Sequence, residues 1–522
     1  MTRRADYALA ACSGALLALS FPSFGIPAIA WVALAPLLLT LGRATLRQAF
    51  LLGLITGIVY FVGTLYWISL VMNQYGGLQM WSAVLVNALL IAYLALYPAL
   101  FAVIVRRLVW AIGPRALLAA PLVWVTTELG RTHLLTGFPW VLLGYSQTPV
   151  LPIAQLASVL GVFGVSGLVA SVSAALVLAL APPGYGVALR RDYGAGGRSG
   201  EAGRLQAFLP LGIAIALVLA VGAWGSLRVA RSELTQAGES ITVGLVQGNV
   251  DQGEKWDAAR AGAIFRDYLR LTREAIAGGA RLVVWPESST PFFFEEDRPA
   301  AEQVRDIARR SNVSILFGSD QIERARPNRY FNSAFMLSPQ GETAAVYRKV
   351  HLVPFGEYVP LKRLLFFAAP LVEAVSDFSA GEHPVLLPVG AHPVSTAICY
   401  EVVYPDLVRL GVAQGSELLT TITNDAWFGR TSAPYQHFAQ AAMRAIENGR
   451  YLVRSANTGI SGIVDPYGRV IAQSGIFEPA VIVGQVRWVQ TLTVYTRVGD
   501  VFAYAALAAT VGLLVAARRR VQ

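Results

Sequence analysis

Apolar stretches alternate with short polar loops over the first 228 residues of this 522-residue chain, and one more apolar stretch lies near its end. An α-helix needs about 20 mostly apolar residues to cross the hydrocarbon core of a bilayer. The span at 116–129 has the weakest pattern, and the first two stretches could instead form one helical hairpin. We expect eight membrane spans, near residues 8–22, 26–41, 47–71, 82–105, 116–129, 152–181, 207–227 and 500–517.

Residues 229–499 show a different pattern, in which short apolar, β-branched runs alternate with amphipathic stretches. Such runs bounded by turn residues predict strands, whereas apolar positions spaced by three and four predict helices. We expect strands at residues 241–250, 282–285, 313–318, 330–338, 342–347, 394–399, 418–423, 451–456, 462–464 and 470–474, and helices at 256–276, 301–310 and 437–448. This alternation is typical of an α/β domain. We therefore divide the chain into membrane helices at 1–228, a polar α/β domain at 229–499, and a last span with a basic tail at 500–522.

The distribution of arginine orients the predicted spans. Loops on the cytoplasmic side of a membrane carry an excess of positive residues. The loops assigned to one side carry 14 arginines, whereas the short loops of the other side carry only Arg131. We therefore expect a multi-pass membrane protein with both termini in the cytoplasm. Residues 229–499 would then lie outside, in the periplasm of a Gram-negative cell.

Composition excludes several classes of protein. Hydrophobic residues make up 55% of the chain and charged residues 14%, whereas a soluble domain has about 25% charged residues. The net charge of +10 belongs to the membrane part and the tail, because residues 229–499 carry 26 basic and 27 acidic residues. We therefore expect no nucleic-acid partner. Two cysteines, Cys12 and Cys399, exclude a disulfide framework and a cysteine-based zinc site.

Three ends of predicted strands carry candidate chemistry. Glu287 follows a buried strand in a Trp-Pro-Glu-Ser sequence, which suits a general base, although a loop carboxylate has the same pattern. Lys349 begins a loop rich in Pro and Gly, where a fixed ammonium could lower a thiol pKa and stabilise an oxyanion, or could be an ordinary surface lysine. Cys399 ends an apolar strand before a turn, which suits a nucleophile or an inert buried thiol. His351 could act as a base or have a structural role.

Together the three strand ends resemble the Glu-Lys-Cys triad of the nitrilase superfamily, in the same order along the chain. With apolar spans on both sides, the chain resembles the membrane-embedded apolipoprotein N-acyltransferases of that superfamily. The resemblance runs nearly end to end, and no catalytic position departs from it. The matching motifs are Gly248-Asn249 with Lys255-Trp256, Trp285-Pro286-Glu287, the run from Arg348 to Pro360, Cys399-Tyr400-Glu401, and Asn424-Asp425-Ala426-Trp427-Phe428-Gly429.

The resemblance implies an α-β-β-α sandwich for the polar domain on an eight-helix membrane base. It also implies transfer of an acyl chain from a phospholipid, at the sn-1 position of phosphatidylethanolamine, to the α-amino group of the diacylglyceryl-cysteine of an apolipoprotein. The reaction would take two half-reactions through a thioester on Cys399. Glu287 would be the general base, and Lys349 with the backbone N–H after Cys399 would stabilise the oxyanion. No metal or soluble cofactor would be required, and we expect a monomer.

The same resemblance implies roles for further residues. Glu357 would orient Lys349, while Tyr400 and Glu401 would shape the loop of the nucleophile. The two tryptophans expected to contact substrate could equally be packing aromatics. The substrate-binding residues implied in this way are Trp256, Asn424 and Trp427.

Two other classes of function remain open. A membrane-tethered amidase or nitrilase would share the triad and differ only in its substrate, and the apolar loops argue against it. One of these loops, at residues 131–152, could guide lipid tails or be an ordinary connection between helices. A non-enzymatic scaffold or transporter would carry an inactive domain. The intact triad argues against it, and Glu128 lies near the end of a span rather than at its middle, where a transport pathway would need charge.

Overall fold

The computed structural model describes residues 4–181, 185, 201–255, 257–358 and 378–519. The chain forms two compact units. The first contains Met1–Ser69, Val84–Ala230 and Val498–Gln522, and the second contains Leu70–Ala83 and Arg231–Arg497. The short segment Leu70–Ala83, which lies between two expected membrane spans, therefore groups with the polar unit.

Apolar helices make up the first unit. In chain order the helices that lie wholly or partly in this unit are α1 (Arg4–Leu19), α2 (Pro27–Ala30), α3 (Ala35–Leu41), α4 (Leu46–Leu65), α5 (Trp67–Gln74), α6 (Met80–Ile112), α7 (Ala120–His133), α8 (Leu151–Ala154), α9 (Ala157–Leu180), α10 (Glu201–Arg231) and α17 (Val501–Arg519). Among the described residues, five helical stretches are long and apolar enough to cross a membrane: α4, α6, α9, the stretch Phe208–Thr235 and α17. The other three expected spans coincide with shorter or interrupted helices, so the number of eight spans stays a prediction.

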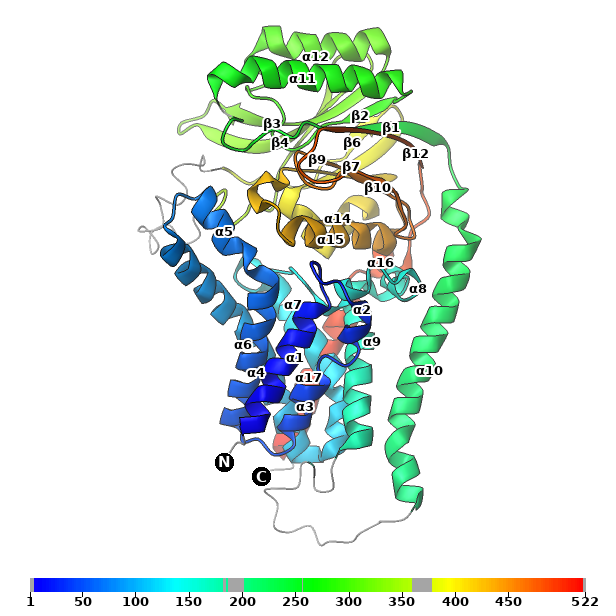
Figure 1. Ribbon diagram of the computed structural model, residues 1–522. Coiled ribbons are helices and arrows are strands. Elements are labelled where there is room, and N and C mark those ends of the chain that lie inside the picture. Colours follow the sequence, from blue (N-terminus) through cyan, green and yellow to red (C-terminus); the bar gives the residue numbers. More distant parts are fainter. Residues whose placement is uncertain (1–3, 182–184, 186–200, 256, 359–377, 520–522) are drawn as a thin grey trace. The chain divides into compact units, whose positions relative to one another are not determined.

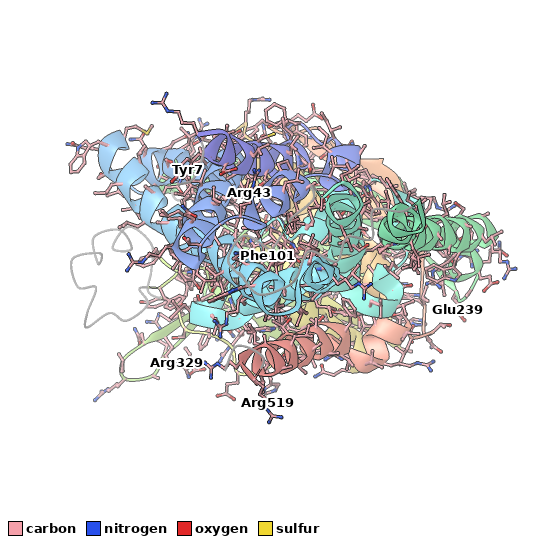
Figure 2. All side chains as sticks on the ribbon, turned by 90° about the horizontal axis from the view of Figure 1, so that it is seen from below. Tyr7, Arg43, Phe101, Glu239, Arg329 and Arg519 are labelled. Atoms are coloured by element: carbon pink, nitrogen blue, oxygen red, sulfur yellow. The ribbon has the colours of Figure 1, made fainter. Side chains whose placement is uncertain are left out.

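Small residues allow these helices to pack closely, as is common between helices in membranes. A Cβ atom on Gly53 of α4 would clash with the backbone oxygen of Pro98 on α6, and one on Gly57 would lie 2.7 Å from the Cα atom of Ala95. Figure 2 looks along the helices and shows Phe101, which is fully buried, near the middle of the view. Larger side chains at these glycines would force α4 and α6 apart.

The loop that follows α7 is fixed by a buried pair of charged residues. The guanidinium of Arg131 donates to the carbonyl oxygen of Trp140 at 2.6 Å, and Glu128 accepts from the backbone N–H of Leu143 at 2.6 Å. Trp140 and Leu143 are buried, whereas Leu135, in the first part of the loop, is 77% exposed. Most of this apolar, aromatic loop is therefore packed inside the first unit, and its exposed tip is short.

Two six-stranded sheets form the centre of the second unit. The first has the order β12-β1-β2-β3-β4-β5 and the second the order β11-β10-β9-β8-β7-β6. The strands are β1 (Ser240–Gln247), β2 (Leu282–Val284), β3 (Ser314–Glu323), β4 (Arg329–Leu337), β5 (Thr343–Arg348), β6 (Leu387–Val389), β7 (His392–Ile398), β8 (Leu418–Thr423), β9 (Leu452–Ala456), β10 (Gly462–Val464), β11 (Val470–Gln473) and β12 (Ala480–Arg487). In each sheet three neighbouring strands run parallel: β1, β2 and β3 in the first, and β7, β8 and β9 in the second.

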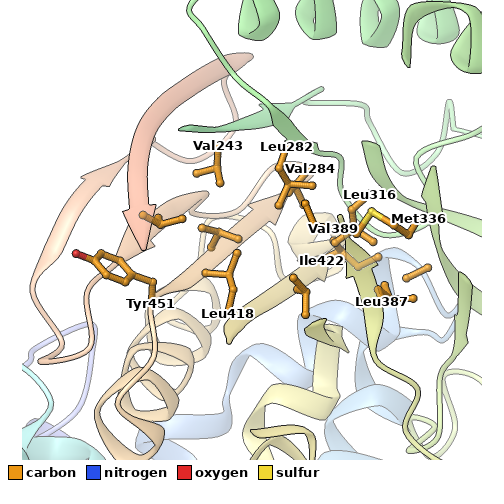
Figure 3. Packing of buried hydrophobic residues seen from close by; sticks show 14 of the residues in the cluster. Val243, Leu282, Val284, Leu316, Met336, Leu387, Val389, Leu418, Ile422 and Tyr451 are labelled. Carbon is orange, nitrogen blue, oxygen red and sulfur yellow. The ribbon is translucent and has the colours of Figure 1, made fainter. Parts of the chain in front are cut away.

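The two sheets face each other across an apolar core. Residues of the first sheet such as Leu282 and Leu316 pack in one cluster with residues of the second such as Leu418 and Ile422 (Figure 3). The helices α11 (Ala258–Ala277) and α12 (Arg298–Ser311) cover the outer face of the first sheet, and α14 (Pro405–Ala413) and α15 (Ala433–Asn448) lie against the second (Figure 1). Both sheets therefore have one apolar face in the shared core.

Most of the predicted strands and helices of the polar unit are present. The structure adds β6, β12, α14 and the short helix α16 (Val494–Val498), which the sequence pattern did not predict. Strand β12 pairs with β1 over its whole length, from Ser240 opposite Arg487 to Gln247 opposite Ala480. The last strand of the polar domain therefore pairs with the first one and forms one edge of the first sheet.

Removal of a side chain from the shared core should destabilise the second unit. Leu282 is fully buried, so Leu282→Ala should lower the free energy of unfolding by about 2–5 kcal/mol. Leu410 on α14 is 40% exposed, and the matched Leu410→Ala should change it by about 0.5 kcal/mol or less. Denaturant unfolding of the detergent-solubilised protein, followed by tryptophan fluorescence, measures both. Equal losses in the two variants would contradict the assignment of the core.

Candidate active site

The ends of several strands bring the candidate residues into one region of the second unit. Glu287 follows β2, Lys349 follows β5, and Cys399 follows β7, with Asn424 directly after β8. The parallel neighbours β7 and β8 end at the same edge of their sheet, and β5, which is antiparallel to β4, runs in the same direction as β2 and β3. The polar side chains of these residues consequently meet at one edge of the two sheets.

The ammonium group of Lys349 lies between two carboxylates. Its Nζ atom is 2.9 Å from Oε1 of Glu357 and 3.5 Å from Oε1 of Glu287. The lysine side chain is 1% exposed. Burial acts to lower the pKa of Lys349, but the charges of Glu357 and Glu287 outweigh it and raise this pKa. Lys349 is therefore a fixed, buried cation and not a surface lysine.

Glu287 is held by hydrogen bonds to both of its carboxylate oxygens. Oε1 accepts from the side-chain amide of Asn332 at 2.7 Å, and Oε2 accepts from the backbone N–H of Asn424 at 2.8 Å. The residue is 7% exposed. Since Asn424 directly follows β8 of the second sheet, one carboxylate connects the two sheets.

Asn332 is a residue that the sequence analysis missed. It lies on β4, is 4% exposed, and its amide nitrogen donates both to Glu287 and, at 3.0 Å, to Oε1 of Glu357. One amide group therefore donates to both carboxylates, and both carboxylates also lie near the ammonium of Lys349. The only signal in the sequence was a polar residue within an otherwise apolar strand, which often indicates no more than an exposed face.

Cys399 has a strained backbone and a buried thiol. Its φ angle is +52°, in the left-handed region that non-glycine residues rarely adopt, and it is 9% exposed. Burial raises the pKa of this thiol, the carboxylate of Glu287 raises it further, and Lys349 and the hydroxyl of Thr423 oppose them only in part. Lys349 thus lowers the thiol pKa, as expected from the sequence, but the effect of burial is larger. The resting site therefore holds a protonated thiol beside the carboxylate of Glu287.

Glu401 connects the loop of Cys399 with the loop of Lys349. It is fully buried, and its Oε2 accepts from the backbone N–H of Ile398 at 2.8 Å. Its Oε1 accepts from the N–H groups of Val350 and His351, at 2.7 and 3.0 Å, and from the hydroxyl of Tyr347 at 2.7 Å. One side chain therefore fixes the backbone on both sides of the site.

His351 and Tyr400 pack beside this connection. The ring of His351 lies 3.9 Å from that of Tyr404, and Tyr400 meets Tyr404 edge to face at 5.3 Å. Burial, assisted by the charge of Lys349, lowers the pKa of His351 to about 4. At neutral pH the imidazole is therefore neutral and packed at a tilt against Tyr404, which fits the structural role that the sequence left open for it.

The expected substrate-binding residues have different surroundings. The side chain of Asn424 donates to Gln252 at 2.6 Å and accepts from Asn457 at 3.0 Å, so both ends of its amide are engaged. Trp427 is half-buried and meets Tyr75, of the segment Leu70–Ala83, edge to face at 5.3 Å. Trp256 lies outside the described residues. Within the described part of the chain, no group of His, Cys, Asp and Glu side chains could hold a metal ion.

Known proteins match the chain over both of its parts. A carbon-nitrogen hydrolase family model matches residues 242–491, and a model of the apolipoprotein N-acyltransferase N-terminal domain matches residues 13–175. An apolipoprotein N-acyltransferase of Geobacter metallireducens is 41% identical over 99% of this chain and 96% of its own length. One of Methylococcus capsulatus is 36% identical over 98% and 96%. An amidase of Nesterenkonia sp. AN1, in a solved structure, covers 51% of this chain and 98% of its own at 22% identity, with a TM-score of 0.38.

The raised thiol pKa of Cys399 predicts how its alkylation rate depends on pH. In a Cys12→Ser background the rate of alkylation by iodoacetamide should rise about tenfold for each pH unit between pH 7 and 9, because only the thiolate reacts. Mass spectrometry at a series of times measures this rate, and Cys12→Ser/Cys399→Ala, which has no thiol, is the control. A rate that is already constant across this range would mean a preformed thiolate and would contradict the assignment.

Proposed function

The chain belongs to the apolipoprotein N-acyltransferase family, and we propose that it acylates the N-termini of lipoproteins through a thioester on Cys399. The acyl donor is a phospholipid, in our proposal phosphatidylethanolamine with its sn-1 chain. The acceptor is the α-amino group of the diacylglyceryl-cysteine at the N-terminus of an apolipoprotein. This reaction completes the maturation of the lipoprotein.

One observation carries the proposal: a buried ammonium held between two carboxylates beside a buried cysteine thiol. Lys349, held by Glu357, keeps its ammonium where an oxyanion would form, and Glu287, 3.5 Å from that ammonium, is then available as a base. A protonated thiol needs such a base before it can attack an ester. The triad Glu287, Lys349 and Cys399 has the groups that this chemistry requires.

In the first half-reaction Glu287 takes the proton of the Cys399 thiol, and the sulfur attacks the ester carbonyl of the phospholipid. The tetrahedral oxyanion is stabilised by Lys349 and by the backbone N–H of Tyr400, each worth about 3–4 kcal/mol as in other oxyanion holes. When the intermediate collapses, the carbon–oxygen bond breaks and Glu287 returns the proton to the leaving lysophospholipid oxygen. The acyl chain remains on Cys399 as a thioester.

In the second half-reaction the neutral α-amino group of the acceptor attacks the thioester. An α-amino group has an unperturbed pKa of about 7.7–8.0, so a usable fraction is neutral at pH 7. Glu287 takes a proton from the attacking nitrogen as the carbon–sulfur bond breaks and transfers it to the sulfur of Cys399. The acyl chain leaves as an amide, and the enzyme returns to its resting state with no metal or soluble cofactor.

The supporting residues act through the triad. Glu357 orients Lys349 by their 2.9 Å contact, and Glu401 holds the loops of both Lys349 and Cys399 in place. Tyr400 contributes its backbone N–H. The residues that we assign to substrate contact are Trp256, Asn424 and Trp427, of which Asn424 also positions Glu287 through its backbone.

The membrane setting of the reaction follows from its two lipid substrates. We propose that the polar unit is an α-β-β-α sandwich on the periplasmic side of the bacterial inner membrane. Eight spans would anchor it, with both termini in the cytoplasm and arginine-rich loops on that side. Because both substrates carry acyl chains, the site must open at the level of the bilayer. The protein acts as a monomer in this proposal.

Acyl transfer can be tested with phosphatidylethanolamine and a synthetic diacylglyceryl-cysteine lipopeptide in mixed micelles. The wild type should yield N-acylated lipopeptide and lysophospholipid in equal amounts, and Cys399→Ala should yield neither. Glu287→Gln should lower the rate by about 10²–10⁴-fold, because a general base contributes this much. Liquid chromatography with mass spectrometry measures both products.

A matched substitution controls for loss of charge alone. Glu342 is exposed in the turn between β4 and β5, so Glu342→Gln should keep the wild-type rate. Release of free fatty acid without acylated lipopeptide would favour a hydrolase of the amidase type. Full activity of Cys399→Ala would exclude the covalent mechanism, and a wild type that releases no lysophospholipid would favour a scaffold.

A further inference from the structure

The carbonyl group of the nucleophile residue is held by a histidine that has no part in the proposed triad. Nε2 of His437 lies 3.2 Å from the backbone oxygen of Cys399. His437 lies on α15, 38 residues along the chain, and is fully buried. A carbonyl oxygen only accepts hydrogen bonds, so Nε2 must carry the hydrogen and donate it.

The other ring nitrogen is set by two charged neighbours. Nδ1 of His437 is 3.0 Å from Nη2 of Arg454 and 3.0 Å from Oδ1 of Asp425. Since Nε2 carries a hydrogen, a neutral ring has none on Nδ1, which then accepts from the guanidinium of Arg454. Asp425 accepts instead from Arg454 and from the hydroxyl of Thr423, both at 2.8 Å. The contact with the carbonyl of Cys399 places a hydrogen on Nε2 in either protonation state of the ring.

The surroundings of the ring favour its neutral form. Burial and the positive charge of Arg454 lower the pKa of His437, and Asp425 opposes them only in part, so the ring is neutral at pH 7. Burial alone would raise the pKa of Asp425, but Arg454, with His437 and Thr423, outweighs it, and the net shift is downward. Arg454 and Asp425 therefore form a fully buried ion pair, and His437 stays neutral between them.

The planarity of the peptide bond connects this hydrogen bond to catalysis. The carbonyl of Cys399 and the N–H of Tyr400 belong to one peptide group, and in a trans peptide they point in opposite directions. A hydrogen bond that fixes the carbonyl toward α15 therefore also fixes the direction of the N–H. The left-handed φ angle of Cys399 makes such a constraint necessary, because a strained residue keeps its conformation only where its surroundings hold it.

We propose that His437 is a positioning residue that aims the oxyanion-binding N–H of Tyr400 by anchoring the carbonyl of Cys399. The proposal rests on the acyl transfer proposed above, in which that N–H stabilises the tetrahedral intermediate. His437 touches no substrate. Its effect appears only in steps that form an oxyanion and not in the nucleophilicity of the thiol.

Two amide substitutions distinguish the role of Nε2 from that of Nδ1. In His437→Gln the longer amide can place a donor where Nε2 lies, whereas in His437→Asn the shorter amide can reach only the position of Nδ1. Acylation of Cys399 is measured as lysophospholipid released from phosphatidylethanolamine in a single turnover. His437→Asn should lose about 100-fold, as when an oxyanion donor is removed, and His437→Gln should stay within about tenfold of the wild type.

Alkylation of Cys399 by iodoacetamide, in the Cys12→Ser background, is the second measurement. This displacement forms no oxyanion, so both variants should react within about threefold of the wild type. His392→Leu changes a histidine that pairs with Glu417 and stacks on Trp488, and it should alter neither rate. Thermal unfolding shows which variants are folded.

Each outcome separates the inference from the function on which it rests. Equal losses of acylation in the Asn and Gln variants, or a parallel loss of alkylation in both, would overturn the positioning role. Unchanged acylation in His437→Asn would overturn it as well.

A wild type that is alkylated but releases no lysophospholipid would instead contradict the acyl transfer itself. If His437→Asn does not fold, wild-type acylation in a folded His437→Leu, which has no donor, would overturn the role, and a loss of acylation with normal alkylation would support it.

Discussion

The buried charge of Lys349 is the constraint on which the rest of the site depends. An isolated ammonium in the interior of a protein is destabilised by several kcal/mol unless partners compensate for its lost hydration. Glu357 and Glu287 supply that compensation, and together they bring two negative charges close to each other. The amide of Asn332 donates to both carboxylates and so reduces the repulsion between them. A cation, its counter-ion and a second carboxylate are therefore fixed together before any substrate arrives.

The two sheets of the polar unit hold these groups at fixed distances. Glu287 follows a strand of the first sheet, Cys399 follows a strand of the second, and the apolar core between the sheets sets their separation. Buried polar side chains then complete the connection: Glu401 joins the loops of Cys399 and Lys349, and the backbone of Asn424 joins the second sheet to Glu287. The thiol stays protonated at rest because burial outweighs the nearby cation. The reactivity of the thiol therefore depends on its deprotonation, for which Glu287 is the base in our proposal.

The sequence predicted the parts of this arrangement that follow from local pattern. Alternating and continuous apolar runs located β1, β2, β7 and β8, and the residues that end or follow them supplied Glu287 and Cys399 as candidates. Partners distant in the chain could not be found in the same way. Asn332 looks like any polar residue on a strand, and His437 acts on a carbonyl 38 residues away. Strand β12 was missed because its role comes from pairing with β1, more than 200 residues earlier.

Intact-mass spectrometry of the protein incubated with phosphatidylethanolamine, with Cys399→Ala alongside, tests the central claim most directly. The account predicts an added mass of one acyl chain on the wild type only. Hydroxylamine should remove this mass, and so should a diacylglyceryl-cysteine lipopeptide, which accepts the chain. An adduct that water discharges while the lipopeptide has no effect would contradict acyl transfer to an amine. Release of lysophospholipid with no adduct on Cys399 would contradict the thioester.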